Sequence, residues 1–307
     1  MKLSREKFAR ARDFIKERAR PLEARLFDFH FEGGSAGAVL DALAAFQNPD
    51  GGFGRAIEPD FRLPDSSPMA TSVGMQHLLA VGAPPDHPLV AGAVGYLVGE
   101  YDREGDFWHH TSMAVNDYPH APWWGKANES RPDEAAWSNP CAELLGCLFY
   151  GAEHVPPDLL EKARRRGMRN LDSGLAFGEP ISYYQMMTWE RAVPHLPKPM
   201  ASQVTRLLRD IYESMKPLTE EKLAEVNLDA LAPAPGSLAA QVLGEDVFRM
   251  LPREIERQSE DGAWWPGWSW GQYEDVWPEV RVEWAGIITV GKLLALRSYG
   301  LLEGGSG

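Results

Sequence analysis

Apolar residues recur along this chain at the three- and four-residue spacing of helices, and no segment shows the alternation of a half-buried strand. The periodicity is clearest in residues 36–46, 68–80 and 280–298. The last of these is apolar nearly all round, which predicts a helix buried on several sides. Weaker amphipathic patterns predict further helices near residues 4–19, 87–100, 157–167, 198–215 and 245–257. We therefore expect an all-α chain with about ten to twelve helices.

Proline marks the start of three predicted helices. Ser67-Pro68 and Asn139-Pro140 each combine a favourable capping residue with a proline suited to the first helical position. Glu179-Pro180 repeats the arrangement with a poorer cap. Each pair predicts a helix that begins at its proline or shortly after it.

No composition shift divides the chain into separate domains. The polar, proline-containing stretches 125–135 and 216–237 are interpreted as loops or weak helices within one body. Residues 1–303 are therefore expected to form a single domain. The last four residues, 304–307, have the Gly-Gly-Ser-Gly sequence of a flexible tail.

One short motif occurs twice. Residues 47–53 and 258–264 share the pattern Q-x-x-D-G-x-aromatic, each after one predicted helix and before another. The Asp-Gly pair suits a turn whose glycine adopts a conformation closed to bulkier residues, and the aromatic ring can pack that turn onto neighbouring helices. The glutamine can bond backbone groups left free at a helix end. Residues 104–108 and 173–178 are interpreted as degenerate copies that lack the glutamine.

These copies resemble the glutamine-tryptophan repeat of the terpenoid cyclase and protein prenyltransferase superfamily, over roughly residues 36–298. The resemblance implies an α/α toroid, a barrel of helical hairpins in which the helices that follow each motif form an inner ring. It also implies that the motif residues brace outer helices against inner ones and do not react. Those residues are Gln47, Asp50, Gln258, Asp261 and Trp264.

The reactive signatures of that superfamily are missing. The chain contains no Asp-x-Asp-Asp string and no Asp-rich magnesium motif, and Cys141 and Cys147 have no zinc-ligand spacing. The resemblance therefore favours an enzyme without supplying its catalytic residues. Neither a metal nor another cofactor is expected.

Charge and hydropathy exclude several partners. The formal net charge of -13 repels phosphate backbones, so nucleic acid is not expected as a partner. No stretch approaches the roughly 18 apolar residues of a transmembrane span, and the first residues lack the apolar run of a signal peptide. The two cysteines are interpreted as reduced core residues. A cytoplasmic protein is the expectation.

Two loops before predicted inner helices carry candidate polar groups. Residues 58–62, Glu-Pro-Asp-Phe-Arg, place two carboxylates beside an arginine, and residues 116–124 gather an acid, a phenol, an imidazole and two indoles. The first loop equally fits an ion-paired clamp, and the second equally fits packing onto the core. We interpret Glu58, Asp60, Asp117 and His120 as candidate acid-base residues. The candidate ligand contacts in these loops are Arg62, Asn116, Tyr118, Trp123 and Trp124.

Tryptophan is concentrated near the C-terminus. Six of the 11 tryptophans lie between residues 264 and 284. Aromatic faces can stabilise carbocations, stack on sugar rings or pack a core, and their spacing does not separate these uses. The candidate ligand contacts here are Trp268, Trp277 and Glu283, with Tyr183 and Tyr184 on another predicted inner helix.

Three functions fit the sequence. The resemblance favours a prenyltransferase-like or cyclase-like protein that holds a polyprenyl or other apolar ligand in an aromatic-lined cavity. The second is a carbohydrate-active enzyme, a lyase or hydrolase, since toroids also serve those reactions and tryptophan walls with paired carboxylates suit sugars. The third is a non-catalytic toroid that binds a peptide or protein. An apolar or sugar-like small molecule is the expected partner.

Overall fold

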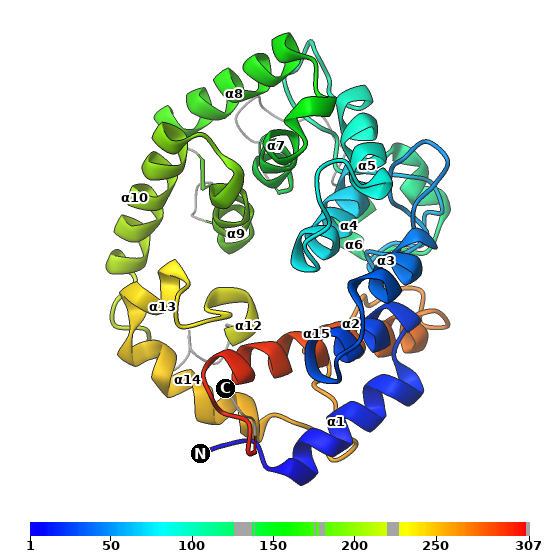
Figure 1. Ribbon diagram of the computed structural model, residues 1–307, viewed down its shortest axis with the longest axis vertical. Coiled ribbons are helices and arrows are strands. Elements are labelled where there is room, and N and C mark those ends of the chain that lie inside the picture. The colour runs from blue at the N-terminus through cyan, green and yellow to red at the C-terminus, as the bar shows by residue number, and fades with distance from the viewer. Residues whose placement is uncertain (126–136, 138, 175, 178–181, 220–226, 305–307) are drawn as a thin grey trace. The chain divides into compact units, whose positions relative to one another are not determined.

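The computed structural model describes residues 1–125, 137, 139–174, 176–177, 182–219 and 227–304 (Figure 1). Within these ranges every regular element is a helix, and extended backbone occurs only as isolated bridges. The all-α prediction is therefore confirmed.

The main helices lie close to the predicted ranges. In chain order the α-helices are α1 (Arg5–Arg18), α2 (Pro21–Phe31), α3 (Ala36–Ala44), α4 (Pro68–Ala80), α5 (Pro88–Gly99), α6 (Pro122–Gly125), α7 (Cys141–Tyr150), α8 (Pro157–Asp172), α9 (Tyr183–Ala192), α10 (Lys198–Ser214), α12 (Leu228–Leu231), α13 (Leu238–Leu243), α14 (Glu245–Glu256) and α15 (Trp277–Ser298). Three short 3₁₀ turns are η1 (Met113–Asp117), η3 (Ala152–His154) and η4 (Val193–His195).

Two of the three proline signals can be compared with the structure. Helix α4 begins at Pro68, and the Ser67 hydroxyl accepts a hydrogen bond from the Ala70 amide at 3.1 Å. Helix α7 begins one residue after Pro140. Residues 179 and 180 lie outside the described residues, as do 126–135 of the first predicted loop and 220–226 of the second.

Helix α2 was not predicted, because a charge interrupts its apolar stripe. Glu23 faces the core, and its carboxylate forms a two-bonded ion pair with the Arg20 guanidinium at 2.7 and 2.9 Å. The Glu23 side chain is only 1% exposed. A buried carboxylate paired in this way replaces an apolar residue in the helical pattern.

The described chain forms two compact units. Unit 1 comprises Met1–Val39, Leu207–Ser269 and Asp275–Gly307, and unit 2 comprises Leu40–Arg206 and Trp270–Glu274. The prediction of one domain over residues 1–303 stays a prediction.

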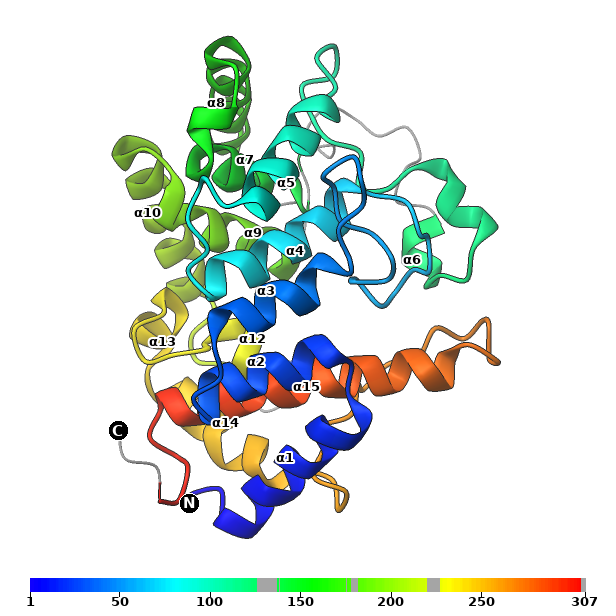
Figure 2. The same cartoon turned by 45° about the vertical axis from the view of Figure 1, so that its right-hand side comes forward.

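In unit 1, helices α1, α2 and α15 lie side by side (Figures 1 and 2). As predicted, α15 is buried on several sides. One buried position is charged: the Lys292 ammonium lies 2.7 Å from an Asp229 carboxylate oxygen on α12 and also contacts Glu254 on α14. This lysine therefore links α15 to two neighbouring helices.

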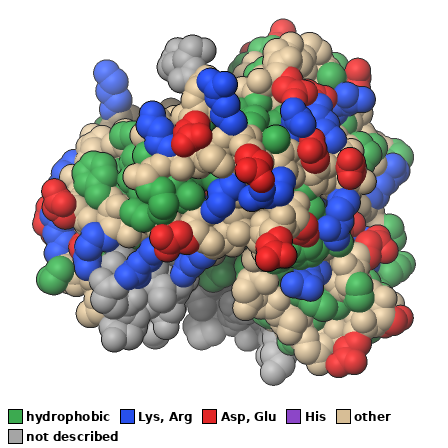
Figure 3. All heavy atoms as spheres, turned by 90° about the horizontal axis from the view of Figure 1, so that it is seen from below, with side chains coloured by type: hydrophobic (Ala, Val, Ile, Leu, Met, Phe, Trp, Pro, Cys, Tyr) green, Lys and Arg blue, Asp and Glu red, His purple; other side chains and the backbone are tan. Residues whose placement is uncertain are grey.

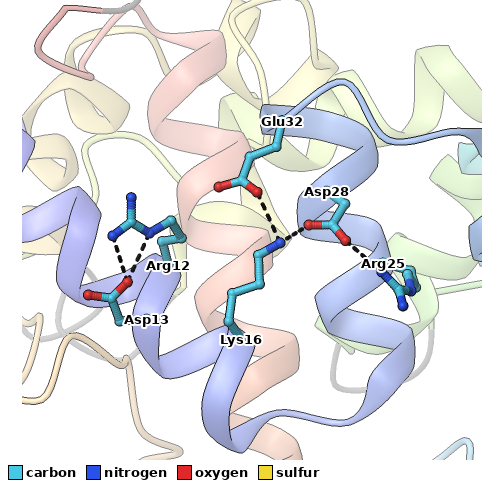
Figure 4. Close-up of polar contacts among 6 residues, drawn as sticks. All are labelled: Arg12, Asp13, Lys16, Arg25, Asp28 and Glu32. Atoms are coloured by element: carbon cyan, nitrogen blue, oxygen red, sulfur yellow. Dashed lines mark hydrogen bonds and ion pairs between the residues drawn. The ribbon is translucent and has the colours of Figure 1, made fainter.

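Ion pairs also join α1 to α2 at the surface of unit 1. The Lys16 ammonium contacts Asp28 and lies 3.0 Å from a Glu32 carboxylate oxygen, and Arg25 pairs with the other oxygen of Asp28 at 3.1 Å (Figure 4). Such partly exposed pairs contribute at most about 1 kcal/mol each. Their main effect is to orient α2 along α1.

In unit 2, α7 packs against α4, α5, α8 and α9. The approach to α9 is close at Gly146, where an added Cβ atom would lie 2.9 Å from the Cα atom of Ala192. Trp189 of α9 is fully buried at this side of the unit 2 core.

The first copy of the repeated motif is a clamp between a turn and a helix in unit 2. The Gln47 carboxamide donates one hydrogen bond to the Gly51 carbonyl of its own turn at 2.8 Å and one to the Leu89 carbonyl of α5 at 2.9 Å. The Phe53 amide donates to the Thr71 hydroxyl of α4 at 3.0 Å. The motif thus holds α4 and α5 against one turn.

The second copy repeats these contacts in unit 1. The Gln258 carboxamide donates to the Gly262 carbonyl of its own turn and to the Lys7 carbonyl of α1, both at 2.9 Å. The Trp264 amide donates to the Thr289 hydroxyl of α15 at 3.0 Å. The two turns are therefore equivalent in their bonds as well as in their sequence.

A glycine lets each turn meet the helix backbone. Gly51 and Gly262 have φ values of 87° and 92°, a region that L side chains rarely adopt. An added Cβ atom would lie 2.4 Å from the Gly92 carbonyl oxygen in the first copy and 2.3 Å from the Arg10 carbonyl carbon in the second. At each position two independent constraints therefore require glycine: the backbone conformation and the close approach of the helix.

The degenerate copies retain the aromatic anchor. Trp108 is fully buried and its indole donates to the Leu97 carbonyl at 2.8 Å. Asp106 adopts a φ of 59° two residues before it. Residues 175 and 178 of the other copy lie outside the described residues, and its Phe177 is buried.

The surface carries charges of both signs. On the face drawn in Figure 3, acidic and basic side chains are interspersed and no field of one sign extends across it. None of the described helices is both long and apolar enough to span a membrane.

A glycine substitution tests the clamp. We expect Gly51→Ala to lower the free energy of unfolding by about 2–4 kcal/mol, because it adds a backbone collision to left-handed strain. Gly82→Ala is the matched control, since Gly82 has a φ of 71° with no atom within 4 Å of an added Cβ, and should cost about 1–2 kcal/mol. Urea denaturation measures both, and equal losses would contradict the clamp.

Candidate active site

Backbone pairing brings the two predicted loops of unit 2 together. Phe61 and His120 form an antiparallel bridge, in which the Arg62 amide donates to the Pro119 carbonyl at 2.9 Å and the Ala121 amide donates to the Asp60 carbonyl at 2.7 Å. Residues 58–62 and 116–124 are therefore one assembly in space.

This assembly buries two carboxylates. Glu58 and Asp60 are 7% and 6% exposed, respectively. The Trp270 indole donates a hydrogen bond to a carboxylate oxygen of Asp60 at 2.8 Å, and the Asp60 amide lies 3.4 Å from a carboxylate oxygen of Glu58. Burial of a carboxylate is costly unless donors surround it, so the loop is built to hold acids away from bulk water.

His120 is buried in the same assembly, and one of its ring nitrogens is engaged. It is 7% exposed, and its Nδ1 lies 2.7 Å from the Tyr118 carbonyl oxygen. Because a carbonyl can only accept, Nδ1 of the neutral ring carries the proton and Nε2 presents its lone pair. Gly125 borders this nitrogen, since an added Cβ there would lie 2.7 Å from Nε2. His120 can therefore accept a proton at Nε2.

The segment 270–274 closes the other side of the histidine. Gln272 donates a hydrogen bond to the His120 carbonyl at 2.6 Å, and the Tyr273 ring centre lies 5.6 Å from that of the imidazole. Tyr273 has a φ of 51°, which is rare for an aromatic residue. This strained conformation accompanies the contact with His120.

The assembly and the segment 270–274 also carry several aromatic rings. Tyr118, Trp123 and Tyr273 are 36%, 46% and 37% exposed. Trp124 is 9% exposed, packs edge-to-face on Phe61 at 5.5 Å, and has an indole N–H with no acceptor among the described residues. The assembly therefore combines buried acids, exposed rings and one unmatched buried donor.

Other predicted residues of this region lie at its surface. Asn116 and Asp117 are exposed in η1, and the Asn116 carboxamide donates to the Met113 carbonyl at 3.0 Å. Arg62 is half-buried. Of the four predicted acid-base residues, the structure thus buries Glu58, Asp60 and His120, all in this loop assembly, and leaves Asp117 exposed.

The remaining predicted contacts lie elsewhere. Tyr183 and Tyr184 begin α9, where their rings meet at 6.1 Å and Tyr184 is 63% exposed. Trp268, Trp277 and Glu283 belong to unit 1.

Sequence reasoning omitted Trp270, Gln272 and Tyr273 from the site. All three lie in the tryptophan-rich segment 264–284, but the Trp270 indole bonds Asp60, which is 210 positions away in the sequence. No spacing rule predicts such a contact.

Helices α7 and α9 carry another buried acid that the sequence did not single out. Glu143 of α7 is 5% exposed and lies 3.2 Å from the Arg191 guanidinium of α9. Desolvation raises the pKa of its carboxyl above the ordinary value, opposed by Arg191 and by a hydrogen bond from Gln76. This acid joins three helices of unit 2.

Among the described residues, no three His, Cys, Asp or Glu side chains are grouped to hold a metal ion. Cys141 and Cys147 are buried and form no disulfide, and burial raises the pKa of the Cys141 thiol to about 12. A thiolate at neutral pH is thereby disfavoured.

Replacing the indole that bonds Asp60 tests this arrangement. We expect Trp270→Phe to lower the free energy of unfolding by about 1 kcal/mol more than Trp108→Phe, because a bond to a carboxylate is worth more than one to a neutral carbonyl. Both indoles are at most 2% exposed, so the loss of ring area is similar. Thermal and urea unfolding measure the difference, and a larger loss in the Trp108 variant would contradict the role of Trp270.

The raised pKa of Glu143 predicts a pH effect. The folded state holds this proton at pH values where the unfolded chain has released it, so the contribution of Glu143 to stability falls as pH rises from the ordinary carboxyl range to the raised pKa. Glu143→Gln should remove this fall. The unfolding free energy of the Glu143→Gln variant minus that of the parent should therefore increase with pH between the ordinary carboxyl pKa and the raised one. A difference that stays constant with pH would contradict the assignment.

Comparison with protein families, curated proteins and solved structures finds no match to this chain. Its function is therefore inferred from its own geometry.

Proposed function

We propose that this chain is an enzyme that performs acid-base chemistry on a hydroxylated, sugar-like small molecule at Glu58, Asp60 and His120. The supporting observation is the burial of both carboxylates in the loop assembly that orients His120 Nε2 as a proton acceptor. Acid-base catalysis requires a donor and an acceptor held near one substrate bond.

The roles differ because the environments differ. An indole N–H can only donate, so Trp270 holds one oxygen of Asp60 as an acceptor, which suits orientation of a substrate hydroxyl. His120 is the proposed base at Nε2. Glu58 is the proposed proton donor. A hydrolysis or an elimination at a glycosidic bond needs this pair of functions.

Solvation favours a hydroxylated ligand over an apolar one. An apolar chain placed against Glu58 and Asp60 would offer their carboxylates no hydrogen bond, which is costly. A polyol offers hydroxyl groups, which are the natural hydrogen-bond donors to carboxylates. The exposed faces of Tyr118 and Trp123 suit stacking on the less polar side of a sugar ring.

We also propose that the helical hairpins close into an α/α toroid. The equivalence of the two glutamine clamps supports this, since each clamp joins the helix after its motif to a second helix. A repeat that makes the same bonds twice is typical of folds built from stacked hairpins.

Turnover of a glycan panel tests the function. The purified chain should cleave at least one class of oligosaccharide, measured as new reducing ends or as unsaturated product absorbing in the ultraviolet. Glu58→Gln and His120→Asn should each lower kcat by about 10²–10⁴-fold, since each removes one proton-transfer step. Asp86→Asn, at an exposed site in unit 2, is the matched control and should keep full activity.

Three outcomes would contradict the proposal. One is the absence of binding and turnover with every glycan. Another is full activity in the Glu58 or His120 variants. The third is turnover of a polyprenyl diphosphate in a parallel assay, which would instead support the apolar-ligand alternative.

A further inference from the structure

Unit 1 contains an open pocket that is separate from the loop assembly of unit 2. Its volume is about 720 Å³, within the range of small-molecule sites. It is formed by the segment after the second motif, the start of α15 and the end of α1. The lining residues that carry the argument are Trp265, Trp268, Trp277, Arg18 and Arg281.

Trp265 organises the cationic side of this pocket. The Arg281 guanidinium lies 4.5 Å from the centre of its ring, and the Arg18 guanidinium lies 5.3 Å from it. Phe14 packs edge-to-face on the same indole at 5.6 Å. Stacking on an aromatic face holds a flexible arginine in one orientation, which lowers the entropy lost when it binds a ligand.

The two arginines differ in their charge balance. Arg18 forms an ion pair with Asp261 at 3.1 Å, and the same carboxylate accepts from the Trp265 indole at 3.3 Å. Arg281 has no ion-pair partner within the described part of the chain. A guanidinium held in this way can bind an anion through two parallel hydrogen bonds.

Two further indoles line the pocket. Trp268 packs edge-to-face on Trp284 at 5.3 Å, and its indole N–H has no acceptor among the described residues. Trp277 begins α15 and lines the same pocket. Indole rings and a guanidinium that line one pocket match a planar body that carries an acidic group.

We propose that this pocket binds a planar organic anion, with its carboxylate on Arg281 and its ring against Trp268 and Trp277. The ligand class follows from the unbalanced guanidinium and the indole wall. The inference is independent of the proposed enzymatic function, because none of its residues belongs to the assembly of Glu58, Asp60 and His120.

A pair of matched probes tests the proposal. Isothermal titration of the full chain compares 2-naphthoate with its neutral analogue 2-naphthamide. We expect naphthoate to bind at least about fivefold more tightly, because only the carboxylate gains a charge-assisted bond. Raising the salt concentration should reduce this preference, since the pocket is open to solvent.

Variants locate the binding. Arg281→Gln should remove the preference for the anion, and Arg281→Lys should retain part of it because the charge remains while the planar fork is lost. Trp277→Leu should weaken both probes. Arg209→Gln, an exposed arginine of unit 1 outside the pocket, is the matched control and should keep the preference. Circular dichroism melts show whether each variant is folded.

The outcomes separate this pocket from the proposed active site. Equal affinity for the two probes, absence of binding, or an unchanged preference in folded Arg281→Gln would each overturn the proposal. Glu58→Gln should leave naphthoate affinity unchanged, and a loss in that variant would place the probe at the other site and also overturn it.

Discussion

The structure depends on a carboxamide that bonds two carbonyl groups at once. Gln47 and Gln258 each join the carbonyl of their own turn to a carbonyl of a neighbouring helix, at distances of 2.8–2.9 Å. Loss of the carboxamide would remove both bonds at once and so release the turn from its neighbouring helix. The motif glycine allows the approach that makes both bonds possible. In each unit the turn, the neighbouring helix and the helix that follows the motif are therefore positioned together.

Both candidate sites arise where the chain leaves such a clamp. After the first motif, the Ser67 amide returns to the Phe53 carbonyl at 3.1 Å, so the intervening residues form a loop with held ends, and this loop carries Glu58 and Asp60. After the second motif, residues 265–276 lead into α15 and supply the indoles of the pocket. Loops on a rigid scaffold can change their chemistry without loss of the fold. The same structural unit thus supports an acidic site in one copy and a cationic, aromatic site in the other.

The charged residues of this protein fall into two groups according to their partners. Lys292 is enclosed by Asp229 and Glu254, and Glu23 by Arg20, so these charges are balanced within the fold. Breaking such a pair leaves an uncompensated buried charge and is strongly destabilising. Glu58 and Asp60 belong to the loop assembly of unit 2, and Arg281 lines an open pocket of unit 1. The proposed sites are built on these three charges.

The sequence by itself determined the all-α class, the main helices and the equivalence of the two motifs. Each of these follows from local spacing: helical periodicity, capping residues and turn chemistry act within a few residues. Only the tertiary structure decided that Trp270 bonds Asp60, that Asp117 is exposed while His120 is buried, and that Trp268 and Trp277 line a pocket with Arg18 and Arg281. Those outcomes depend on contacts between segments up to 210 residues apart, and on which face of a loop becomes desolvated when the helices pack.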